Sequence, residues 1–492
     1  MRKLNFTQAL INNIHRSYSY TATRNRWGHH ISPEKYDPLT FFESVMDSDP
    51  FEAFMFLDHY GFKRAKRDLD RYGIPYTPDQ LKAAQAFDVV TTVMQVQRRD
   101  VVGVNFGPPP LSPKIAAVGA PNLYTTHDTI DAQKAVKRLN LTNQGMLPLA
   151  SEVDDPHFIK EQRDALELLL THRHACLIGG AGTGKSYLTA KLVAYFGDKA
   201  HPLAPTHKAR INLQDKLGKK GAVVETVQSF IHKQDATQQG RVLIIDEAGM
   251  LSSSLVAKLA PFFDTADRVY FIGDKNQLPP IGYGRPFERL QTVLPCAELY
   301  HNHRSESADI VMLGREILGE PYNDQLKAKN IVAVPTVEAA FKAGADVVLT
   351  HTNGKVDEIN ETKRLRHGTP AVYPEWRVGE KIVAYATDYR RRRRFYNGEL
   401  FDIVAPNLLR GAGGKVVAVT RDDLRRNFKP AYGLTIHKAQ GSEWPCVAYL
   451  PNPLDSQNLA YTAVTRARQK LIIIGRLNSS YPPERTWQQL NL

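Results

Sequence analysis

The sequence predicts an α/β protein with two parallel-sheet domains, a small β-barrel inserted into the second domain, and a mostly helical N-terminal region. From about residue 156, short apolar runs end at polar or glycine residues, which is typical of buried strands in parallel sheets. These runs form two sets, so we expect two sheets. The first set lies at 174–178, 201–205, 242–245 and 269–272, and the second at 346–349, 447–450 and 471–474.

The inserted barrel is expected at 376–430, where short strand patterns and turns interrupt the second set. Asn397-Gly398 and the glycine cluster at 411–414 are typical of hairpin turns. We therefore assign the first α/β domain to 151–295, with a short hairpin insertion near 231–240. The second α/β domain is assigned to 296–375 and 431–492.

Residues 1–150 form the expected N-terminal accessory region. Apolar residues near helical spacing indicate a helix between 41 and 72. Another helix is predicted to begin at Thr77-Pro78, with Thr77 as the N-cap and Pro78 in the first turn. Residues 103–125 are rich in glycine and proline, which favours a linker or an extended arm.

Composition limits the class of protein. The chain has 492 residues, enough for three or four domains, and its net charge of +13 favours a polyanionic partner such as nucleic acid. The alternative is a basic surface that serves only solubility. No run approaches the roughly 18 apolar residues of a membrane span. Cys176, Cys296 and Cys446 lack metal-ligand spacing and suit buried free thiols in the cytoplasm of a bacterial or phage-infected cell.

A glycine-rich segment at 179–186 lies between the first expected strand and a helical pattern. It fits the pattern of a glycine, any four residues and then Gly-Lys-Ser. In this context the backbone N–H groups surround phosphate oxygens, and the helix N-terminus adds partial positive charge. Lys185 is predicted to reach the β- and γ-phosphates of ATP, and Ser186 to bind Mg²⁺. The predicted phosphate-binding residues are Gly179, Gly180, Ala181, Gly182, Thr183, Gly184, Lys185 and Ser186.

Asp246 and Glu247 directly follow the apolar run at 242–245, at the carboxyl end of an expected strand. In P-loop enzymes an acid at this place holds Mg²⁺, and its neighbour activates water. We assign Asp246 to the metal, through water, and Glu247 to the general base. The alternative is a pair of acidic turn residues after a core strand. The phosphate-binding segment at 179–186 makes this alternative less favoured.

Further short motifs occur in a fixed order, at 158–163, 204–209, 226–230, 246–250, 273–280, 299–304, 435–443 and 461–468. This ordered set resembles the superfamily 1 helicases. Ala-Pro-Thr-His-Lys at 204–208 and Gln-Leu-Pro-Pro at 277–280 indicate the 1B branch, the RecD and Dda type. The resemblance covers about residues 156–475. It implies two RecA-like domains and identifies the inserted barrel as SH3-like.

The resemblance implies roles at the nucleotide. Gln162 would read the adenine edge, and Glu443 would contact the sugar. His303 stands where the family often has an aromatic residue that stacks on adenine, so this sequence departs from the pattern there.

At the phosphates, the resemblance implies that Gln277 senses the γ-phosphate and that two arginines of the second domain act as arginine fingers. The expected catalytic residues are therefore Lys185, Glu247, Gln277, Arg304 and Arg466.

The resemblance also implies a strand-binding surface whose hydroxyl and amide groups follow phosphates without reading sequence. Helix capping by threonine is the alternative at these positions. The matching residues are Thr206, His207, Thr226, Thr435 and His437. The arginine run at 390–394 is either a further phosphate contact or a solvated hairpin loop.

Taken together, the motifs imply an ATP-dependent DNA helicase that moves 5′ to 3′ along single-stranded DNA in replication, recombination or repair. Its expected partners are single strands, duplex junctions and replication or recombination proteins that bind the N-terminal region, and no membrane is expected. The alternatives are a DNA-binding ATPase switch that does not unwind processively and an RNA-directed helicase. Because the segment 231–240 is short and polar, we expect residues 1–150, through the arm at 108–113, to help split the duplex.

Overall fold

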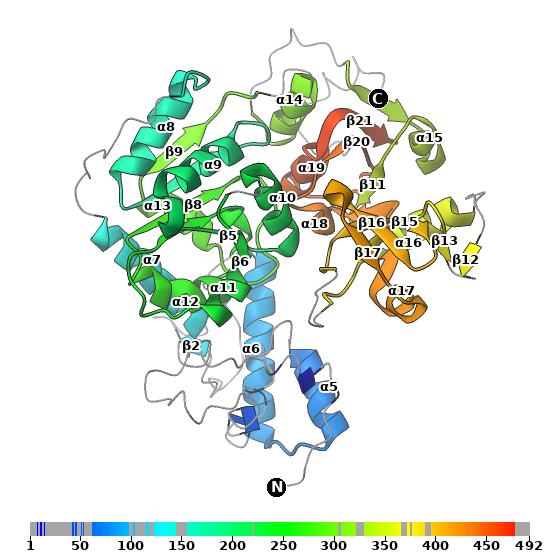
Figure 1. Ribbon diagram of the computed structural model, residues 1–492. Helices are drawn as coiled ribbons and strands as arrows, with labels where there is room; N and C mark the ends of the chain where they lie inside the picture. Colours follow the sequence, from blue (N-terminus) through cyan, green and yellow to red (C-terminus); the bar gives the residue numbers. More distant parts are fainter. Residues whose placement is uncertain are drawn as a thin grey trace.

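This computed structural model describes residues 62–97, 102–103, 115–117, 123–143, 155–218, 221–303, 307–320, 329–365, 371–373, 376–388 and 395–477, with single positions between 7 and 53 (Figure 1). The proposed arm at 108–113, Arg304 and the arginine run at 390–394 lie outside the described residues. Among the described helices, none is long and apolar enough to cross a bilayer.

The first sheet has six parallel strands in the order β6-β5-β7-β8-β4-β9. All residues of β4 and β7 are buried, because helices cover both faces of the sheet, and this explains their continuous apolar runs. The four predicted strands of this domain are confirmed as β4 (His174–Gly179), β5 (Ala200–Ala204), β7 (Val242–Ile245) and β8 (Arg268–Gly273). Two strands that the sequence analysis did not predict, β6 (Glu225–Thr226) and β9 (Cys296–Leu299), complete the sheet.

Alternate residues of each strand enter two separate cores. In β4, Cys176 and Ile178 face the core made with α11 (Val227–Lys233), α12 (Ser253–Phe263) and α13 (Pro286–Val293). Ala175 and Leu177 face the opposite core, made with α8 (Lys160–Thr171) and α9 (Lys185–Phe196). A further helix of this domain, α10 (His207–Leu217), follows β5.

Helix α7 (His127–Thr142) lies in the expected accessory region but packs into the first core. Its buried apolar residues are Ala132, Ala135, Val136 and Leu139. The helix lies along α12 (Figure 1), and Asn143 Oδ1 accepts a 2.9 Å hydrogen bond from the His174 N–H. The first α/β unit therefore begins before residue 127, and the expected boundary at 150 is too late.

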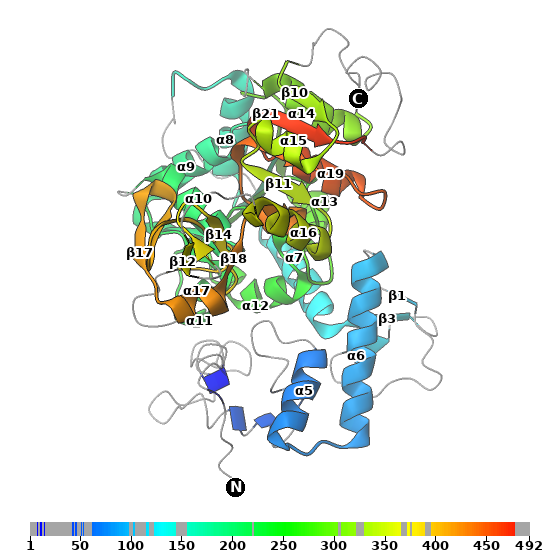
Figure 2. The same cartoon turned by 90° about the vertical axis from the view of Figure 1, so that its right-hand side faces the viewer.

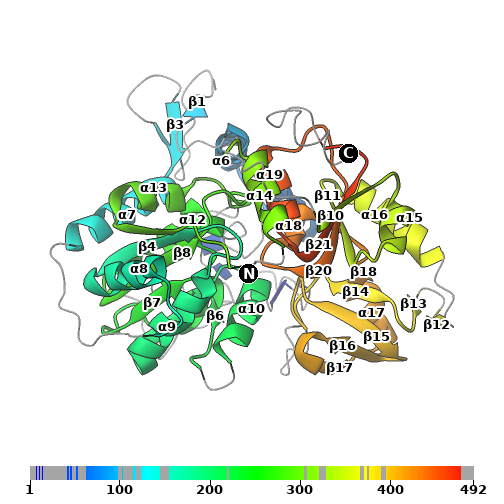
Figure 3. The same cartoon turned by 90° about the horizontal axis from the view of Figure 1, so that it is seen from above.

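The second sheet has five parallel strands in the order β10-β21-β20-β11-β19, so the second parallel-sheet domain is also confirmed. Viewed from above, this domain lies beside the first (Figure 3). Its strands are β10 (Ile331–Val334), β11 (Val347–Thr350), β19 (Gly433–Thr435), β20 (Trp444–Tyr449) and β21 (Ala467–Ile474). Its helices are α14 (Ala308–Ile317), α15 (Val337–Lys342), α16 (Asn353–Leu365), α18 (Ile436–Ala439) and α19 (Gln457–Val464).

Between β11 and β19 the chain forms a separate antiparallel sheet in the order β17-β16-β15-β14-β18. It has its own apolar core, in which Phe395, Phe401 and Phe428 pack together. Its elements are β14 (Lys381–Ala384), β15 (Leu400–Ala405), β16 (Leu408–Gly411), β17 (Val416–Ala418), α17 (Arg421–Asn427) and β18 (Phe428–Pro430). A short pair, β12 (Ala371–Tyr373) and β13 (Trp376–Arg377), precedes it. The SH3-like identity of this insertion stays a prediction.

The N-terminal helices α5 (Phe62–Tyr72) and α6 (Pro78–Gln97) extend away from the two sheets (Figures 1 and 2). Thr77 and Gln80 form reciprocal side-chain-to-backbone hydrogen bonds of 3.1 and 2.8 Å, so the predicted start of α6 is confirmed. The expected arm at 103–125 instead contributes strands to a small antiparallel sheet. These strands are β1 (Val102–Gly103), β2 (Ile115–Ala117) and β3 (Leu123–Thr126).

The hairpin expected near 231–240 does not form, although the structure describes this whole segment. Helix α11 continues to Lys233, and turns lead from there to β7. The turn is held by Arg241, whose guanidinium donates to Asp235 O at 2.7 Å. Buried Phe230 and Ile231 favour extension of the helix, because both side chains enter the first core.

Candidate functional site

The predicted phosphate loop connects β4 to α9, as its sequence context requires. Gly184 has a left-handed backbone (φ +91°), and a Cβ there would lie 2.8 Å from Gln162 Nε2. Lys185 Nζ donates to the carbonyl oxygens of Gly179 and Gly180 at 2.6 and 2.7 Å. The lysine therefore lies across the loop and must leave these oxygens to contact a phosphate.

Asp246 and Glu247 stand at the carboxyl end of β7, next to this loop. Glu247 adopts a left-handed backbone (φ 51°), which is rare for a residue with a side chain and costs about 1–3 kcal/mol. Burial raises the pKa of both carboxyl groups, and the charge of Asp246 raises that of Glu247 further. A carboxyl group with a raised pKa suits proton abstraction near neutral pH.

A cation already lies where the predicted metal ligands meet. Lys216 Nζ donates to Ser186 Oγ at 2.8 Å, and the positive charge of Lys216 acts to lower the pKa of Asp246. Mg²⁺ needs only one or two protein ligands, because water and phosphate oxygens supply the rest. The oxygens of Ser186 and Asp246 therefore suit Mg²⁺, provided that Lys216 moves aside.

Gln162 and His303 meet at the edge of the phosphate loop. Gln162 Nε2 and His303 Nε2 are 3.0 Å apart, and the His303 N–H donates to Gly182 O at 3.0 Å. Gln162 is 4% exposed, and its Oε1 accepts from the Ile159 N–H at 3.3 Å. The structure thus brings Gln162, which the resemblance assigned to the adenine edge, together with His303, which stands where the family often has a stacking aromatic residue.

The phosphate loop also touches the second domain through Tyr461 of α19. The Tyr461 hydroxyl donates to Asp274 Oδ2 at 2.9 Å, and Gln277 Nε2 donates to the same oxygen at 3.3 Å. Burial and the Asp274 carboxylate raise the pKa of Tyr461 well above its usual value. A Cβ at Gly180 would lie 3.1 Å from the Tyr461 hydroxyl, so a glycine is favoured there.

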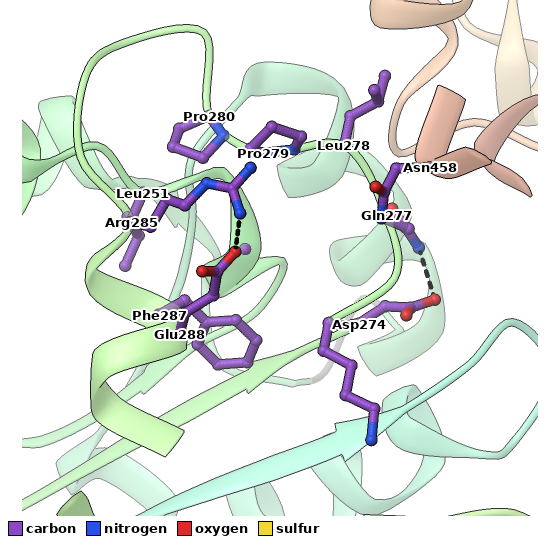
Figure 4. A pocket seen from close by; sticks show the side chains of 12 residues that line it. Leu251, Asp274, Gln277, Leu278, Pro279, Pro280, Arg285, Phe287, Glu288 and Asn458 are labelled. Atoms are coloured by element: carbon purple, nitrogen blue, oxygen red, sulfur yellow. Dashed lines mark hydrogen bonds and ion pairs between the residues drawn. The ribbon is translucent and has the colours of Figure 1, made fainter. Parts of the chain in front are cut away.

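Further hydrogen bonds join the domains along the loop after β8. Asn458 Nδ2 donates to Asn276 O at 2.8 Å, and Gln440 Nε2 donates to Leu278 O at 3.2 Å. Beside this loop lies a cavity of about 40 Å³, into which Asp274, Gln277 and Asn458 project (Figure 4). It has room for about three water molecules and is too small for a nucleotide.

Arg466 follows α19 and is 3% exposed. Its guanidinium donates to Thr462 O at 3.0 Å, Ser442 O at 3.3 Å and Thr465 Oγ1 at 3.4 Å. These three acceptors are uncharged, and the positive charge of Arg466 acts to lower the pKa of Glu247 across the domain boundary. Its predicted partner Arg304 lies outside the described residues.

The predicted sugar contact, Glu443, lies in the second domain just before β20. Its side chain is exposed, and its carboxylate lies 4.0 Å from Arg468 Nε. An exposed carboxylate is able to accept hydrogen bonds from sugar hydroxyls, and this role of Glu443 stays a prediction.

The three threonines of the predicted strand-binding surface all cap helices. Thr206, Thr226 and Thr435 each accept the backbone N–H three residues ahead, at 3.2, 3.1 and 3.3 Å. Such a cap uses an oxygen lone pair and leaves the hydroxyl proton able to donate. The His207 ring lies 4.5 Å from the ring of Tyr396, which lies between β14 and β15 of the inserted sheet, and His437 is an exposed residue of α18.

Several residues of the site carried no individual prediction. Apart from Lys216, which lies between two motifs, they lie within or next to the predicted motifs, but their roles depend on interactions between distant segments, which no local pattern reveals. These residues are Lys216, Asp274, Gln440, Asn458 and Tyr461.

Two protein families match the chain. The family described as AAA domain matches residues 157–327, and that described as UvrD-like helicase C-terminal domain matches residues 430–474. The first covers the six-stranded sheet and the second covers most of the strands and helices that follow the inserted sheet.

Relatives in sequence include helicases of the RecD type. The chain is 27% identical over 416 residues to the ATP-dependent RecD2 DNA helicase of Deinococcus radiodurans, covering 75% of this chain and 57% of that protein. It is 28% identical over 406 residues to the RecBCD enzyme subunit RecD of Mycobacterium tuberculosis, covering 65% of this chain and 70% of that protein. The resemblance to RecD-type helicases is therefore confirmed, although the chain spans little more than half of RecD2.

Among solved structures, the Pif1 helicase of Candida albicans aligns with a TM-score of 0.46 and 18% identity, covering 68% of this chain and 98% of that chain. Bacteroides Pif1 bound to single-stranded DNA aligns with a TM-score of 0.48 and 17% identity, covering 68% and 97%.

Proposed function

We propose that this chain, a relative of the RecD-type helicases, is an ATP-dependent DNA helicase that moves 5′ to 3′ along single-stranded DNA. The observation that carries the proposal is that the phosphate loop and the acidic pair of the first parallel-sheet domain lie close to residues of the second. Lys185 and Glu247 come from the first domain, and Tyr461 and Arg466 come from the second. RecD2 of Deinococcus radiodurans, a relative over three quarters of this chain, is described as an ATP-dependent DNA helicase.

In this proposal, ATP replaces the internal hydrogen bonds of the phosphate loop. Lys185 exchanges the carbonyl oxygens of Gly179 and Gly180 for phosphate oxygens, and Lys216 leaves Ser186. Glu247 accepts a proton from the attacking water, and the charge of Arg466 stabilises the charge that develops on the phosphates. Mg²⁺, held by Ser186 and through water by Asp246, would neutralise part of the phosphate charge.

Movement along DNA follows from the interactions between the domains. Hydrogen bonds from α19 reach the loop after β8, so a change at the phosphates alters how the two sheets meet. Thr206 and Thr226 in the first domain and Thr435 in the second lie at carboxyl ends of strands, where hydroxyl protons can donate to strand phosphates. Alternating grip by the two domains then produces steps along the strand.

The test is unwinding of duplexes that carry a single-stranded tail of either polarity. We expect ATP-dependent strand displacement with a 5′ tail, little with a 3′ tail, and ATPase stimulation by DNA strands. A Lys185→Ala variant is the control, because it keeps the fold and loses the phosphate contact. Hydrolysis without displacement would identify an ATPase switch instead, and stimulation by RNA alone would identify an RNA-directed helicase.

A further inference from the structure

Two of the three cysteines lie side by side in the first sheet. Cys176 of β4 and Cys296 of β9 are in register on neighbouring parallel strands. Strands in a sheet are about 4.8 Å apart, which falls within the Cα separation of roughly 4.4–6.8 Å that a disulfide requires. Because more than one hundred residues separate the two cysteines in the chain, their pairing could not be predicted from the sequence.

Both side chains project from the same face of the sheet. Cys176 is buried in the core formed with α7, α12 and α13, and Cys296 packs against that core while remaining partly exposed. Each thiol shifts the pKa of the other, as expected for neighbouring side chains. The in-register pairing and the shared core therefore place the two thiols next to each other.

We propose that Cys176 and Cys296 form a redox-active dithiol that closes to an intramolecular disulfide when a small disulfide such as glutathione disulfide is present. The Cys296 thiolate attacks one sulfur of the reagent, forms a mixed disulfide and releases one thiolate. The Cys176 thiol then loses its proton and attacks Cys296 Sγ, and the second thiolate leaves. Two protein thiols are oxidised by two electrons, and one disulfide is reduced to two thiols.

The surroundings of the two cysteines explain why Cys296 attacks the reagent first and Cys176 attacks second. Cys296 is the partly exposed member and lies on β9, the edge strand of the sheet, so a reagent reaches it first. The neighbouring Cys176 thiol lowers the pKa of Cys296, while the Cys296 thiol and burial raise the pKa of Cys176 well above its usual value. In the thiol form, Cys296 Sγ donates to Gln291 O and Leu294 O at 3.4 and 3.3 Å.

The third cysteine provides an internal comparison. Cys446 belongs to β20 of the other sheet, and its backbone N–H donates to Asp346 Oδ2 at 2.9 Å. Cys446 is buried, and burial raises the pKa of its thiol. It shares burial with Cys176 but has a different sheet and different neighbours, so it should not enter the disulfide.

The position of the dithiol is close to the nucleotide site. Cys176 lies three residues before Gly179, and β9 leads through Leu299 to His303, whose N–H contacts the phosphate loop. The disulfide would thus join the two strands that carry the loops around the expected nucleotide. The assignment of the dithiol itself does not depend on the proposed helicase activity.

The test is thiol trapping of the full-length protein after incubation with glutathione disulfide. Unfolding in an alkylating reagent should then modify one cysteine, Cys446, and peptide mapping should show Cys176 linked to Cys296. Dithiothreitol should restore all three thiols. Alkylation of Cys176 together with a lasting glutathione adduct on Cys296 would overturn the proposal, as would three unreacted thiols.

Three single cysteine-to-serine variants distinguish a specific Cys176–Cys296 disulfide from unspecific oxidation of thiols. Cys446→Ser should still form the link, so that no thiol remains for alkylation. Cys176→Ser should stop at the glutathione adduct of Cys296, because no second thiol displaces it. Cys296→Ser should leave both remaining thiols unoxidised. A link that forms in Cys296→Ser would assign the reaction to other cysteines and contradict the pairing.

Discussion

Helix α7 offers a decisive test of where the first domain begins. Removing residues 1–150 should prevent folding of the first domain, because the deletion takes α7 out of its core. Burial of Val136 and Leu139 contributes about 1.5–3 kcal/mol each, and Ala132 and Ala135 add about 0.8 kcal/mol each. The sum of about 5–8 kcal/mol is comparable with the roughly 5–15 kcal/mol that stabilises a typical domain.

The same deletion also removes polar interactions between α7 and the rest of the first domain. The Thr142 hydroxyl lies 3.1 Å from His174 Nε2, and Arg138 Nε forms a 2.8 Å ion pair with Asp264. A protein that begins at residue 122 keeps both interactions and the Thr126 cap of α7, which accepts from the Thr129 N–H at 3.1 Å. We therefore expect this shorter deletion to fold and to retain ATPase activity.

The assay is thermal and urea unfolding followed by circular dichroism. In the full-length chain, Leu139→Ala should lower the free energy of unfolding by about 2–5 kcal/mol. Leu141→Ala, on the same helix, is the matched control, because Leu141 is 56% exposed and should cost less than about 0.5 kcal/mol. Equal effects of the two substitutions, or a cooperative transition in the protein that begins at 151, would refute the reasoning.

Four further predictions concern the site and its pH dependence. Lys185→Ala should weaken nucleotide binding, whereas Glu247→Gln should keep binding and lose turnover; near-normal hydrolysis by the latter would contradict the base assignment. Arg466→Ala should lower kcat far more than ATP affinity in steady-state and binding assays, and equal losses would assign Arg466 to ground-state binding. Tyr461→Phe removes the hydrogen bond to Asp274, and a bond to a charged group contributes about 1.5–3 kcal/mol. ATPase activity should therefore fall about 10- to 150-fold, and unchanged activity would show that the contact is dispensable. Burial lowers the pKa of His174 to about 4, so protonation of this ring should lower the free energy of unfolding by about 3 kcal/mol as the pH drops from 6.5 to 4. Urea unfolding of His174→Gln should show a shallower decline of stability over this pH range, and parallel profiles of the two proteins would contradict the assignment.

The sequence was sufficient for the parallel sheets and for the phosphate loop. Strands covered on both faces are apolar along their whole length, so the runs at β4 and β7 could be recognised without knowing their neighbours. The loop between β4 and α9 could be recognised because its glycines serve a local purpose, shown by the left-handed backbone of Gly184. Features fixed by residues adjacent in sequence were therefore predictable.

Errors arose where distant segments decide the structure. The segment 231–240 was expected to form a hairpin, but Phe230 and Ile231 enter the first core and extend α11. Helix α7 was assigned to the accessory region, because nothing within its own sequence states which sheet it covers. The pairing of Cys176 with Cys296 depends on the order of strands in the sheet, and periodicity cannot determine that order.

The interactions between the two domains show why the order of the motifs located the site but did not predict the hydrogen bonds within it. Tyr461 lies in a predicted motif, yet its hydroxyl acts through Asp274, which lies in another motif of the other domain. Gln277 reaches the same carboxylate, so one buried charge receives hydrogen bonds from both domains. Because a buried carboxylate left without donors is costly, separation of the sheets at this point must be compensated by new hydrogen bonds. A nucleotide bound at the adjoining phosphate loop is well placed to supply them, and this would couple its phosphates to movement between the domains.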